Sequence, residues 1–284
     1  MSVDELLALW WVFPSAVVFA TVAVGSGVSG ALFFSPFFML VVGLSPAQAV
    51  GAGLLTEVFG MGNGLRSYVR QGLVDYATVR WLLAGAVPSA LAGALVAHSV
   101  PAGVLRGIFG VGLVVLAAFL LFQKPPDQCE PGEKSGGLVD RKSEGKGTTR
   151  IEAADGTVYE YATCWRLPGV VLAAVGGALT GLVSAGLPEI STTQLVVRCR
   201  IPPRVAVATS VFTLAVTAVA AAGVHALAAA PAWNVVAWSV PGVLVGSTLG
   251  ARVGRWIPSG RMEKILGAVF AAVGALVLGL QLAG

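Results

Sequence analysis

Most of the chain consists of long apolar stretches separated by short polar ones. An α-helix needs about twenty apolar residues to cross a bilayer. The pattern predicts helical segments over 6–24, 30–43, 46–65, 77–97, 104–122, 168–183, 188–197, 203–227, 233–251 and 262–280. The segments 30–43 and 188–197 are too short to cross at about 1.5 Å per residue.

Both short segments follow stretches that interrupt a helix. Residues 25–36 read GSGVSGALFFSP and residues 181–189 read GLVSAGLPE. Backbone that leaves a helix at bilayer depth must be buried in protein or line a cavity. We therefore predict two broken helices whose free N–H groups face a central site suited to a small anion. The alternative is that these glycines only let helices pack closely.

The candidate ligands in these breaks are hydroxyls, glycine backbone and uncharged donors. They are Gly25, Ser26, Gly27, Ser29 and Gly30 in the first break, and Ser184, Gly186, Thr192, Thr193 and Gln194 in the second. Asn63 is a further uncharged donor, near membrane depth. In the first break we expect Gly25, Gly27 and Gly30 to supply the φ freedom that the interruption requires.

The two halves of the chain resemble each other. Residues 44–53 align with 201–210, and 84–116 align with 237–273 with a small gap. The alignment matches prolines at two helix starts, which favours a duplication over a chance similarity of small residues. The matched pairs are Pro88 with Pro241, Pro101 with Pro258 and Gly110 with Gly267.

Basic residues orient the two copies. They follow the segment 46–65 in the first copy and precede the segment 203–227 in the second. Since basic loops face the cytoplasm, this pattern requires that the copies enter the membrane in opposite senses. We predict an all-α polytopic membrane protein of two inverted-topology repeats, each with three full transmembrane helices and one broken-helix hairpin, about 8–10 helical segments in all. Inverted repeats with broken helices are typical of secondary transporters.

The composition supports the membrane prediction. Of 284 residues 56% are hydrophobic and 11% charged, whereas roughly a quarter are charged in soluble domains. The net charge of +4 fits basic cytoplasmic loops, and no basic stretch alternates with aromatic residues as in a nucleic-acid-binding surface. Asp4 and Glu5 stand where a cleavable signal would be basic, so we expect none.

Charged residues gather in the middle of the chain. Residues 124–166 hold seven of the 18 basic and eight of the 14 acidic residues. We predict a first membrane repeat over 1–123, a soluble cytoplasmic insert over 124–166 and a second repeat over 167–284. Asp155-Gly156 lies between alternating residues and predicts a β-hairpin with a type I′ turn.

The three cysteines are odd in number and lack metal-binding spacing. We interpret Cys129, Cys164 and Cys199 as incidental, neither metal-binding nor disulfide-forming. No metal site, no other cofactor and no catalytic residue is expected. The expected partners are the lipid bilayer and a small anionic substrate, without nucleic acid, and the sequence leaves a homo-oligomer open.

A glycine-rich break, an apolar stretch with proline and an Ala-Val helix start occur twice, and residues 68–76 read YVRQGLVDY. In these features the chain resembles the sulfite exporter TauE/SafE family of membrane permeases over nearly its whole length, except 124–166. The resemblance implies export of small sulfur oxyanions or organosulfonates, such as sulfite, and we expect a multi-pass protein of a bacterial inner membrane. It also makes Thr209 and Ser210 candidate ligands. The first half has Gly51-Ala52-Gly53 at the place of Ala208-Thr209-Ser210 and so lacks these hydroxyls.

Two acidic residues lie at membrane depth, Glu57 in the segment 46–65 and Glu189 beside the second break. An ionisable group there costs roughly 2.5–3.5 kcal/mol on insertion scales and is a functional candidate. Either can carry a proton coupled to anion movement. The alternative for Glu57 is a partner such as Arg66 or a polar neighbour on another helix. The alternative for Glu189 is capping of the helix start.

The remaining ionisable residues have simpler interpretations. Arg66, Arg70, Arg198 and Arg200 are candidate mouth charges that recruit anions, or else determinants of topology. His98 and His225 fall at predicted helix ends, where we expect single capping or snorkelling residues.

One alternative belongs to another class of protein. Residues 27–30 read GVSG, the nucleophile motif of intramembrane serine proteases of the rhomboid type. Such an enzyme needs a histidine within hydrogen-bonding reach of Ser29, and it gives no reason for a second break. A channel, a transporter of another small anion and a membrane scaffold also stay open.

Overall fold

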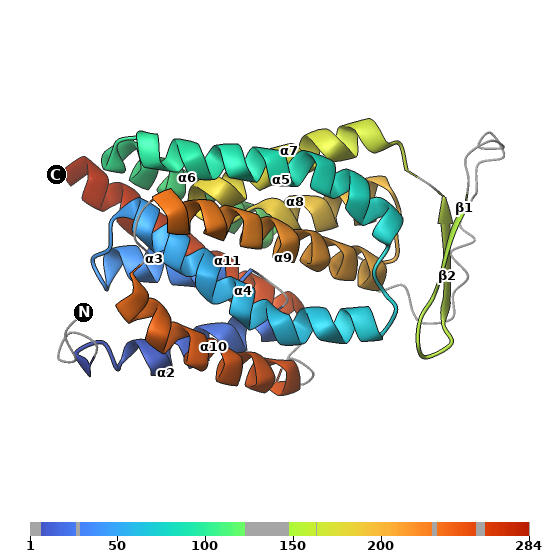
Figure 1. Ribbon diagram of the computed structural model, residues 1–284, viewed down its shortest axis with the longest axis horizontal. Coiled ribbons are helices and arrows are strands. Elements are labelled where there is room, and N and C mark those ends of the chain that lie inside the picture. Colours follow the sequence, from blue (N-terminus) through green and yellow to red (C-terminus); the bar gives the residue numbers. More distant parts are fainter. Residues whose placement is uncertain are drawn as a thin grey trace.

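The computed structural model describes residues 7–26, 29–122, 148–162, 164–228, 232–253 and 259–283. Its helices are α2 (Val12–Ser26), α3 (Ala31–Leu40), α4 (Pro46–Arg70), α5 (Tyr76–Ser99), α6 (Ala102–Phe122), α7 (Arg166–Val183), α8 (Leu187–Thr193), the π-helical turn η2 (Gln194–Arg198), α9 (Pro203–Ala228), α10 (Trp233–Val253) and α11 (Ser259–Ala283). The strands are β1 (Thr148–Glu152) and β2 (Val158–Ala162). Figure 1 shows the helices side by side in one body, with the two strands beyond one end.

Each of the ten predicted apolar segments contains a helix, and the two segments that follow the breaks are short. Helix α4 continues past the predicted end at residue 65 because no glycine or proline lies between that residue and Gly72, which has a φ of +68°. The N–H of Leu73 then donates to the carbonyl of Tyr68 at 3.3 Å and closes the helix end. Arg66 and Arg70 consequently lie on α4 and not in the following turn.

Among the described residues, three helices are long and apolar enough to cross a membrane, namely α5, α7 and α9. Helices α2, α3, α6 and α11 contain shorter apolar stretches. Large apolar side chains are exposed along several of these helices, among them Leu95, Val115, Val175 and Val219. Such a surface is suited to lipid tails, and the protein is a helical membrane protein.

The helices pack in pairs that join the two halves of the chain. Helix α7 lies along α5, α2 lies along α10, α6 lies along α11, and α4 crosses α9 at the centre. Glycines allow the first two pairs to approach closely. A Cβ at Gly181 would overlap the carbonyl of Ala90, and one at Gly246 would overlap the carbonyl of Val17. Close packing is thus one role of these small residues.

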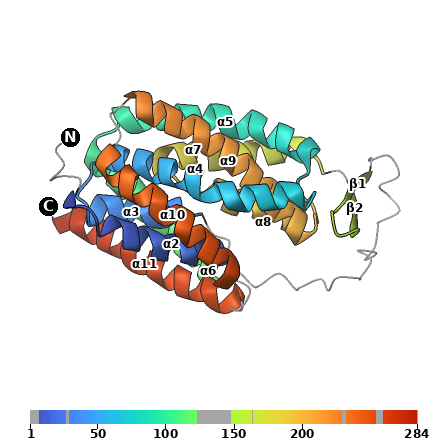
Figure 2. The same cartoon turned by 60° about the horizontal axis from the view of Figure 1, so that its bottom comes forward.

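The strands define one end of the helical body, here called the hairpin end. The N–H of Ala154 in the turn of the hairpin donates to the carbonyl of Gln71 after α4 at 2.9 Å. Arg204 at the start of α9 lies 3.8 Å from Asp155. The beginning of α2 and the last turn of α11 lie at the opposite end, here called the far end (Figures 1 and 2).

Two helical hairpins start from opposite ends. The ring of Trp11, just before α2, lies 5.7 Å from that of Phe37 in α3, so α2 and α3 form a hairpin that returns to the far end. Cys164 before α7 and Cys199 after η2 are disulfide-bonded, so α7, α8 and η2 form a hairpin that returns to the hairpin end. The two breaks, between α2 and α3 and between α7 and α8, are the tips of these hairpins.

The disulfide corrects the interpretation of the cysteines as incidental. The Cα atoms of Cys164 and Cys199 lie 5.2 Å apart, although 35 residues separate them in the sequence. Only the return of η2 to the start of α7 brings them together, and cysteine spacing does not reveal this. Cys129 lies outside the described residues.

The turn between β1 and β2 differs from the predicted type I′ turn. The N–H of Gly156 donates to the carbonyl of Ala153 at 2.9 Å, and Gly156 has a φ of +80° while Asp155 does not have a positive φ. A type I′ turn requires positive φ at both central residues. The glycine therefore follows the turn as its left-handed residue. Glu152 and Val158 form the last pair of the two strands, so five residues lie between the strands. This connection is longer than the two-residue loop of a type I′ hairpin.

Candidate substrate site at the two helix breaks

In the first break, a serine and the start of a helix face a carboxylate. Ser29 is buried between α2 and α3, and its hydroxyl donates to Oε1 of Glu57 on α4. The N–H of Ala31, the first residue of α3, donates to the same oxygen at 3.4 Å. The other oxygen of Glu57 has no hydrogen-bond partner among the described residues. The partners of Glu57 are thus Ser29 and the N–H end of α3. Arg66 is exposed and is not its partner.

In the second break, two residues adopt left-handed conformations. Helix α7 ends at Ser184 with a φ of +61°, and Gly186 follows with a φ of +114°. The N–H of Leu187, which begins α8, donates to the hydroxyl of the buried Thr180 at 3.3 Å. The chain reverses here within three residues, and Gly186 occupies a conformation that is open mainly to glycine.

Glu189 lies in the first turn of α8. The N–H groups of Gly186, Glu189 and Ser29 lie close to its carboxylate. Both carboxylate oxygens are inaccessible to solvent, and neither makes a hydrogen bond within the described part of the chain. The carboxylate therefore stands where the free N–H groups of both breaks converge.

The two breaks meet in the interior of the protein. The hydroxyls of Ser35 on α3 and Ser184 lie 2.5 Å apart and share a hydrogen bond. Both are buried, with 1% and 0% of their surface exposed. Ser29 links the two carboxylates, because its hydroxyl donates to Glu57 and its N–H lies close to Glu189. Residues from both halves thus form one polar cluster, called here the break cluster: the buried Ser29, Ser35, Glu57 and Ser184 with the half-buried Gly186 and Glu189.

Gly53 explains why the first half lacks the Thr-Ser pair of the second. A Cβ at Gly53 would overlap the hydroxyl of Ser35. In the second half, the hydroxyl of Thr209 accepts the N–H of Asp75 at 3.1 Å and so holds the start of α5. Ser210 is buried and its hydroxyl has no partner among the described residues. Only Ser210 of this pair keeps a free hydroxyl.

The helix after the second break has further unpaired polar atoms. Gln194 is buried, and its Nε2 donates to the carbonyl of Gly169 at 3.4 Å while its Oε1 has no described partner. The buried hydroxyl of Ser191 also has none in the described part of the chain. Thr192 and Thr193 are half-buried on α8.

The first break contains residues whose side chains are not described. Gly27 lies outside the described residues, and so do the side chains of Ser26 and Asn63. Gly25 and Ser26 form the end of α2. Gly30 has a φ of −65°, an ordinary helical value. The expectation that Gly30 supplies φ freedom is therefore wrong, because the chain can start α3 without a left-handed residue at this position.

The sequence matches known proteins along most of its length. The sequence model of the family described as "Sulfite exporter TauE/SafE" matches residues 12–277. The chain belongs to this family. It is 23% identical over 267 residues to the "Probable membrane transporter protein YunE" of Bacillus subtilis (strain 168), with 93% of each chain covered. It is 33% identical over 81 residues to the "Probable membrane transporter protein ORF9" of Sinorhizobium sp, covering 28% of this chain and 31% of that protein. No solved structure matches the chain significantly.

Membership of the TauE/SafE family confirms the resemblance predicted from the motifs and identifies the chain as a membrane transporter. It implies a bilayer environment and a small anionic substrate. Among the described residues, no group of three or more metal-ligating side chains is present.

The candidate mouth charges of this TauE/SafE protein are remote from the break cluster. Arg66, Arg70, Arg198 and Arg200 are all exposed. Arg198 donates to the carbonyl of Trp165 at 2.6 Å, next to the disulfide at the hairpin end. These charges can attract anions to that end but do not touch the cluster.

The two histidines are partners, which corrects their interpretation as single helix-end residues. His98 and His225 are 3.0 Å apart through Nε2 and Nδ1, and Nε2 of His225 lies 2.9 Å from the carbonyl of Gly181. Because a carbonyl only accepts, Nε2 of His225 carries the hydrogen, and in a neutral ring Nδ1 accepts from His98. Sequence separation hid this contact between the ends of α5 and α9.

The same contacts bear on the protease alternative. The hydroxyl of Ser29 is bonded to Glu57, whereas each histidine is bonded to the other. The serine–histidine pairing that such an enzyme requires is absent from the described residues. Membership of a transporter family is consistent with a protein that is not an enzyme.

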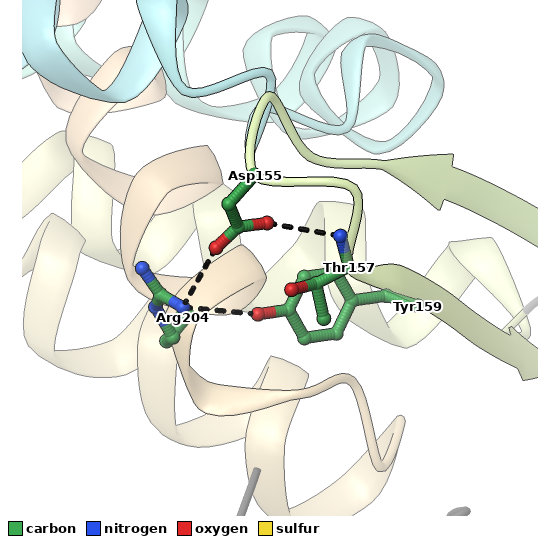
Figure 3. Close-up of polar contacts among 4 residues, drawn as sticks. All are labelled: Asp155, Thr157, Tyr159 and Arg204. Carbon is green, nitrogen blue, oxygen red and sulfur yellow. Dashed lines mark hydrogen bonds and ion pairs between the residues drawn. The ribbon is translucent and has the colours of Figure 1, made fainter. Parts of the chain in front are cut away.

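At the hairpin end, the strands attach to both halves. The hydroxyl of Tyr161 donates to Asp75 at 2.9 Å, and burial together with this carboxylate raises the pKa of Tyr161. Figure 3 shows Arg204 between Asp155 and the hydroxyl of Tyr159, to which it donates at 3.3 Å. Asp75 comes from the turn after α4 and Arg204 from α9, so the hairpin bridges the halves.

Proposed function

We propose that this TauE/SafE protein is a secondary transporter that exports small sulfur-containing anions, sulfite or organosulfonates, by alternating access. The observation that carries the proposal is the meeting of the two breaks, where Ser35 and Ser184 share a hydrogen bond of 2.5 Å across the halves. Helix breaks at the interface of two repeats are where secondary transporters bind substrate.

Helix packing supports an inverted relation between the halves. Suppose that α2 corresponds to α7 and that α5 corresponds to α10. Exchanging the halves then turns the pair α2–α10 into the pair α7–α5, and the helices of both pairs are in extensive contact. Likewise α4–α10 becomes α9–α5, and both of these contacts exist. The broken hairpins return to opposite ends, as inverted copies require. Rocking of the halves about the break cluster would expose it to one side at a time.

The distribution of arginine supports the orientation. Arg66, Arg70, Arg198, Arg200 and Arg204 all lie toward the hairpin end. By the positive-inside rule this end faces the cytoplasm. The insert 124–166 is then cytoplasmic, between repeats 1–123 and 167–284, and both termini face outward from a bacterial inner membrane.

The chemistry of the break cluster suits an anion that travels with protons. The N–H of Ala31 is bonded to Glu57, and those of Ser29 and Gly186 lie close to Glu189. An arriving anion needs the same N–H groups, and an ionised carboxylate would repel it. Protonation of Glu57 and Glu189 would release the N–H groups to the substrate. The further ligands proposed are Gly25, Ser26, Gly27, Gly30, Asn63, Thr192, Thr193, Gln194, Thr209 and Ser210.

The test is flux into proteoliposomes that contain the purified protein, with labelled sulfite or sulfoacetate and with or without a pH gradient. We expect saturable flux that Ser29→Ala and Ser184→Gly abolish. Glycine is chosen at 184 because it accepts the φ of +61° without strain. Ser247→Ala is the matched control, since Ser247 is 2% exposed on α10 and its hydroxyl bonds the carbonyl of Leu244 and no other described residue.

Two further variants test proton coupling. Glu57→Gln and Glu189→Gln each keep the shape of the side chain without its charge, so we expect flux that no longer responds to the pH gradient. Unchanged pH dependence in both variants would contradict the coupling role. Absence of flux of either anion in folded protein would contradict the substrate class, and flux of another small anion would favour the alternative substrate.

A further inference from the structure

The disulfide Cys164–Cys199 closes the base of the second broken hairpin. Cys164 lies just before α7 and Cys199 just after η2, so the bond encloses α7, the break and α8. Arg198 reinforces the closure by donating to the carbonyl of Trp165 at 2.6 Å. Nε2 of Gln194 in η2 also donates to the carbonyl of Gly169 near the start of α7, at 3.4 Å. The base of the hairpin that carries Ser184 and Glu189 is therefore held by one covalent bond and two hydrogen bonds in the described part of the chain.

One cysteine of the disulfide lines a small pocket. Cys164 lines a pocket of about 80 Å³ at the hairpin end, together with Thr149, Tyr161, Arg166 and Asp75. Room for one water requires about 10–15 Å³ on this measure, so the pocket admits a small oxyanion. Cys199 is 7% exposed and does not line the pocket. A reagent in the pocket reaches Cys164 first.

The charges around this pocket favour an anion. Arg166 contributes to the lining, and Arg198 and Arg200 flank Cys199 in the sequence. Asp75 is the acidic residue of the lining, but its oxygens already accept from Ala77, Thr78 and Tyr161. Clustered arginines raise the local concentration of anions and favour a cysteine thiolate as leaving group.

We propose that the Cys164–Cys199 disulfide is a covalent sulfite-sensing site at the cytoplasmic end of the transporter. The sulfur lone pair of sulfite attacks Sγ of Cys164, and the S–S bond breaks with its electron pair leaving on Cys199 as a thiolate. Cys164 becomes an S-sulfonate. Attack of the Cys199 thiolate on the S-sulfonate releases sulfite and restores the disulfide, so neither direction needs an added oxidant or reductant.

This inference rests on the proposed function for the identity of the anion and for the cytoplasmic location of the hairpin end. Cytosolic disulfides are uncommon and are usually transient or redox-sensing, which fits a sensor better than a structural bond. Cleavage leaves only hydrogen bonds, from Arg198 to Trp165 and from Gln194 to Gly169, to close the hairpin base among the described residues. The second broken hairpin then moves more freely, so that a rise in cytoplasmic sulfite increases flux.

The test is peptide mass mapping of the purified full chain in a Cys129→Ser background, after exposure to sulfite or to sulfate. Sulfate has no sulfur lone pair and serves as the matched anion. We expect one S-sulfonate on Cys164 and one thiol on Cys199 with sulfite, and an intact disulfide with sulfate. The proposal is overturned if the adduct is on Cys199, if it forms only after unfolding, or if the purified chain holds two thiols.

A second arm tests the pocket. Arg166→Gln should slow adduct formation roughly fivefold, the factor for loss of one unit charge about 4 Å away in water. Arg106→Gln, an exposed arginine on α6 outside the pocket lining, should leave the rate unchanged. Equal rates in both variants would contradict the role of the pocket. Thermal unfolding of each variant shows whether the fold is retained.

Flux measurements separate this inference from the proposed function. Adduct formation without flux of any sulfur anion would leave the modification site standing and contradict the transport function. Flux that is identical before and after adduct formation, and in Cys164→Ser/Cys199→Ser, would contradict the sensor and leave the transporter standing. We expect flux to increase on adduct formation and in the double variant.

Discussion

The first and second breaks carry equivalent polar groups on different backbones. In the first, Gly30 has an ordinary helical φ of −65° and Ala31 starts a ten-residue helix. In the second, Ser184 and Gly186 are left-handed, and α8 has seven residues before it widens into the π-turn η2. The two breaks thus hold comparable places at the tips of two helical hairpins but differ in local conformation.

The carboxylates differ in the same way. The acceptor for the first break, Glu57, comes from a neighbouring helix, whereas Glu189 belongs to the helix that follows the second break. Both arrangements bring a buried carboxylate to free N–H groups. In both halves, N–H groups and a carboxylate converge at the break. The halves differ in which helix supplies the carboxylate.

The largest effect is expected where the two breaks differ in backbone conformation. Gly186→Ala forces a side chain into a φ of +114° and places its Cβ 3.2 Å from Leu179. We expect a loss of about 1–3 kcal/mol of stability and loss of flux. Gly30→Ala is the matched control, because its φ is ordinary and its Cβ would lie 3.4 Å from Phe34. Equal unfolding midpoints for the two variants would contradict the comparison.

A smaller effect is expected where the first break packs on α4. Gly53→Ala overlaps the hydroxyl of Ser35, which can rotate away only by giving up Ser184. We expect about 1–2 kcal/mol of destabilisation from overpacking. Gly62→Ala on the same helix has open space and should be neutral or slightly stabilising. Restoration of stability in Gly53→Ala/Ser35→Ala would confirm the cause, and its absence would contradict it.

The hydrogen bond between the breaks should appear as a coupling energy. In a double-mutant cycle of Ser35→Ala and Ser184→Gly, we expect about 0.5–1.5 kcal/mol of non-additivity in the free energy of unfolding. The second serine is replaced by glycine so that the left-handed backbone adds no strain of its own. Additive effects would mean that the two breaks do not depend on each other.

The smallest effect concerns the β-hairpin of β1 and β2. It covers the hairpin end, to which the second broken helical hairpin returns and the first does not. The N–H of Thr157 donates to Asp155 at 3.0 Å and, with Arg204 as a weaker contribution, lowers the pKa of Asp155. Because the native pKa lies below the unfolded one, this contribution is complete above the ordinary pKa of aspartate. It is lost as the pH falls through the lowered native value.

Asp155→Asn should therefore remove this pH dependence and change the unfolding midpoint little, because the pair with Arg204 is exposed. Flux should be unchanged at neutral pH. The measurement is the unfolding midpoint against pH for both proteins. A large loss of stability at neutral pH would show that the hairpin contributes more to holding the halves together than an exposed pair can.

Much of the helical fold could be predicted from local pattern. Apolar runs marked each helix of the described residues, because helices of a membrane protein expose apolar side chains to lipid or bury them in protein. Glycine, serine and proline marked both breaks. The end of α4 was missed by five residues, since its last turns are polar and only the φ of +68° at Gly72 ends the helix.

The candidate site was predicted only in part. Ser29, Ser184, Gly186 and both buried acids could be found as polar residues at apolar depth. Ser35 was missed because one serine among phenylalanines in residues 32–38 resembles packing. Its partner Ser184 lies 149 residues away, and no local pattern indicates the pairing.

The sequence by itself determined the family, the membrane class of the protein and the position of both breaks, because these depend on residue type and local spacing. The tertiary structure alone decided which distant residues meet: Ser35 with Ser184, Ser29 with Glu57, His98 with His225, and Cys164 with Cys199. The physical reason is that these contacts depend on how helices cross and return. Helix crossings are set by small residues that admit close approach, such as Gly53 and Gly181, whose neighbours come from elsewhere in the chain.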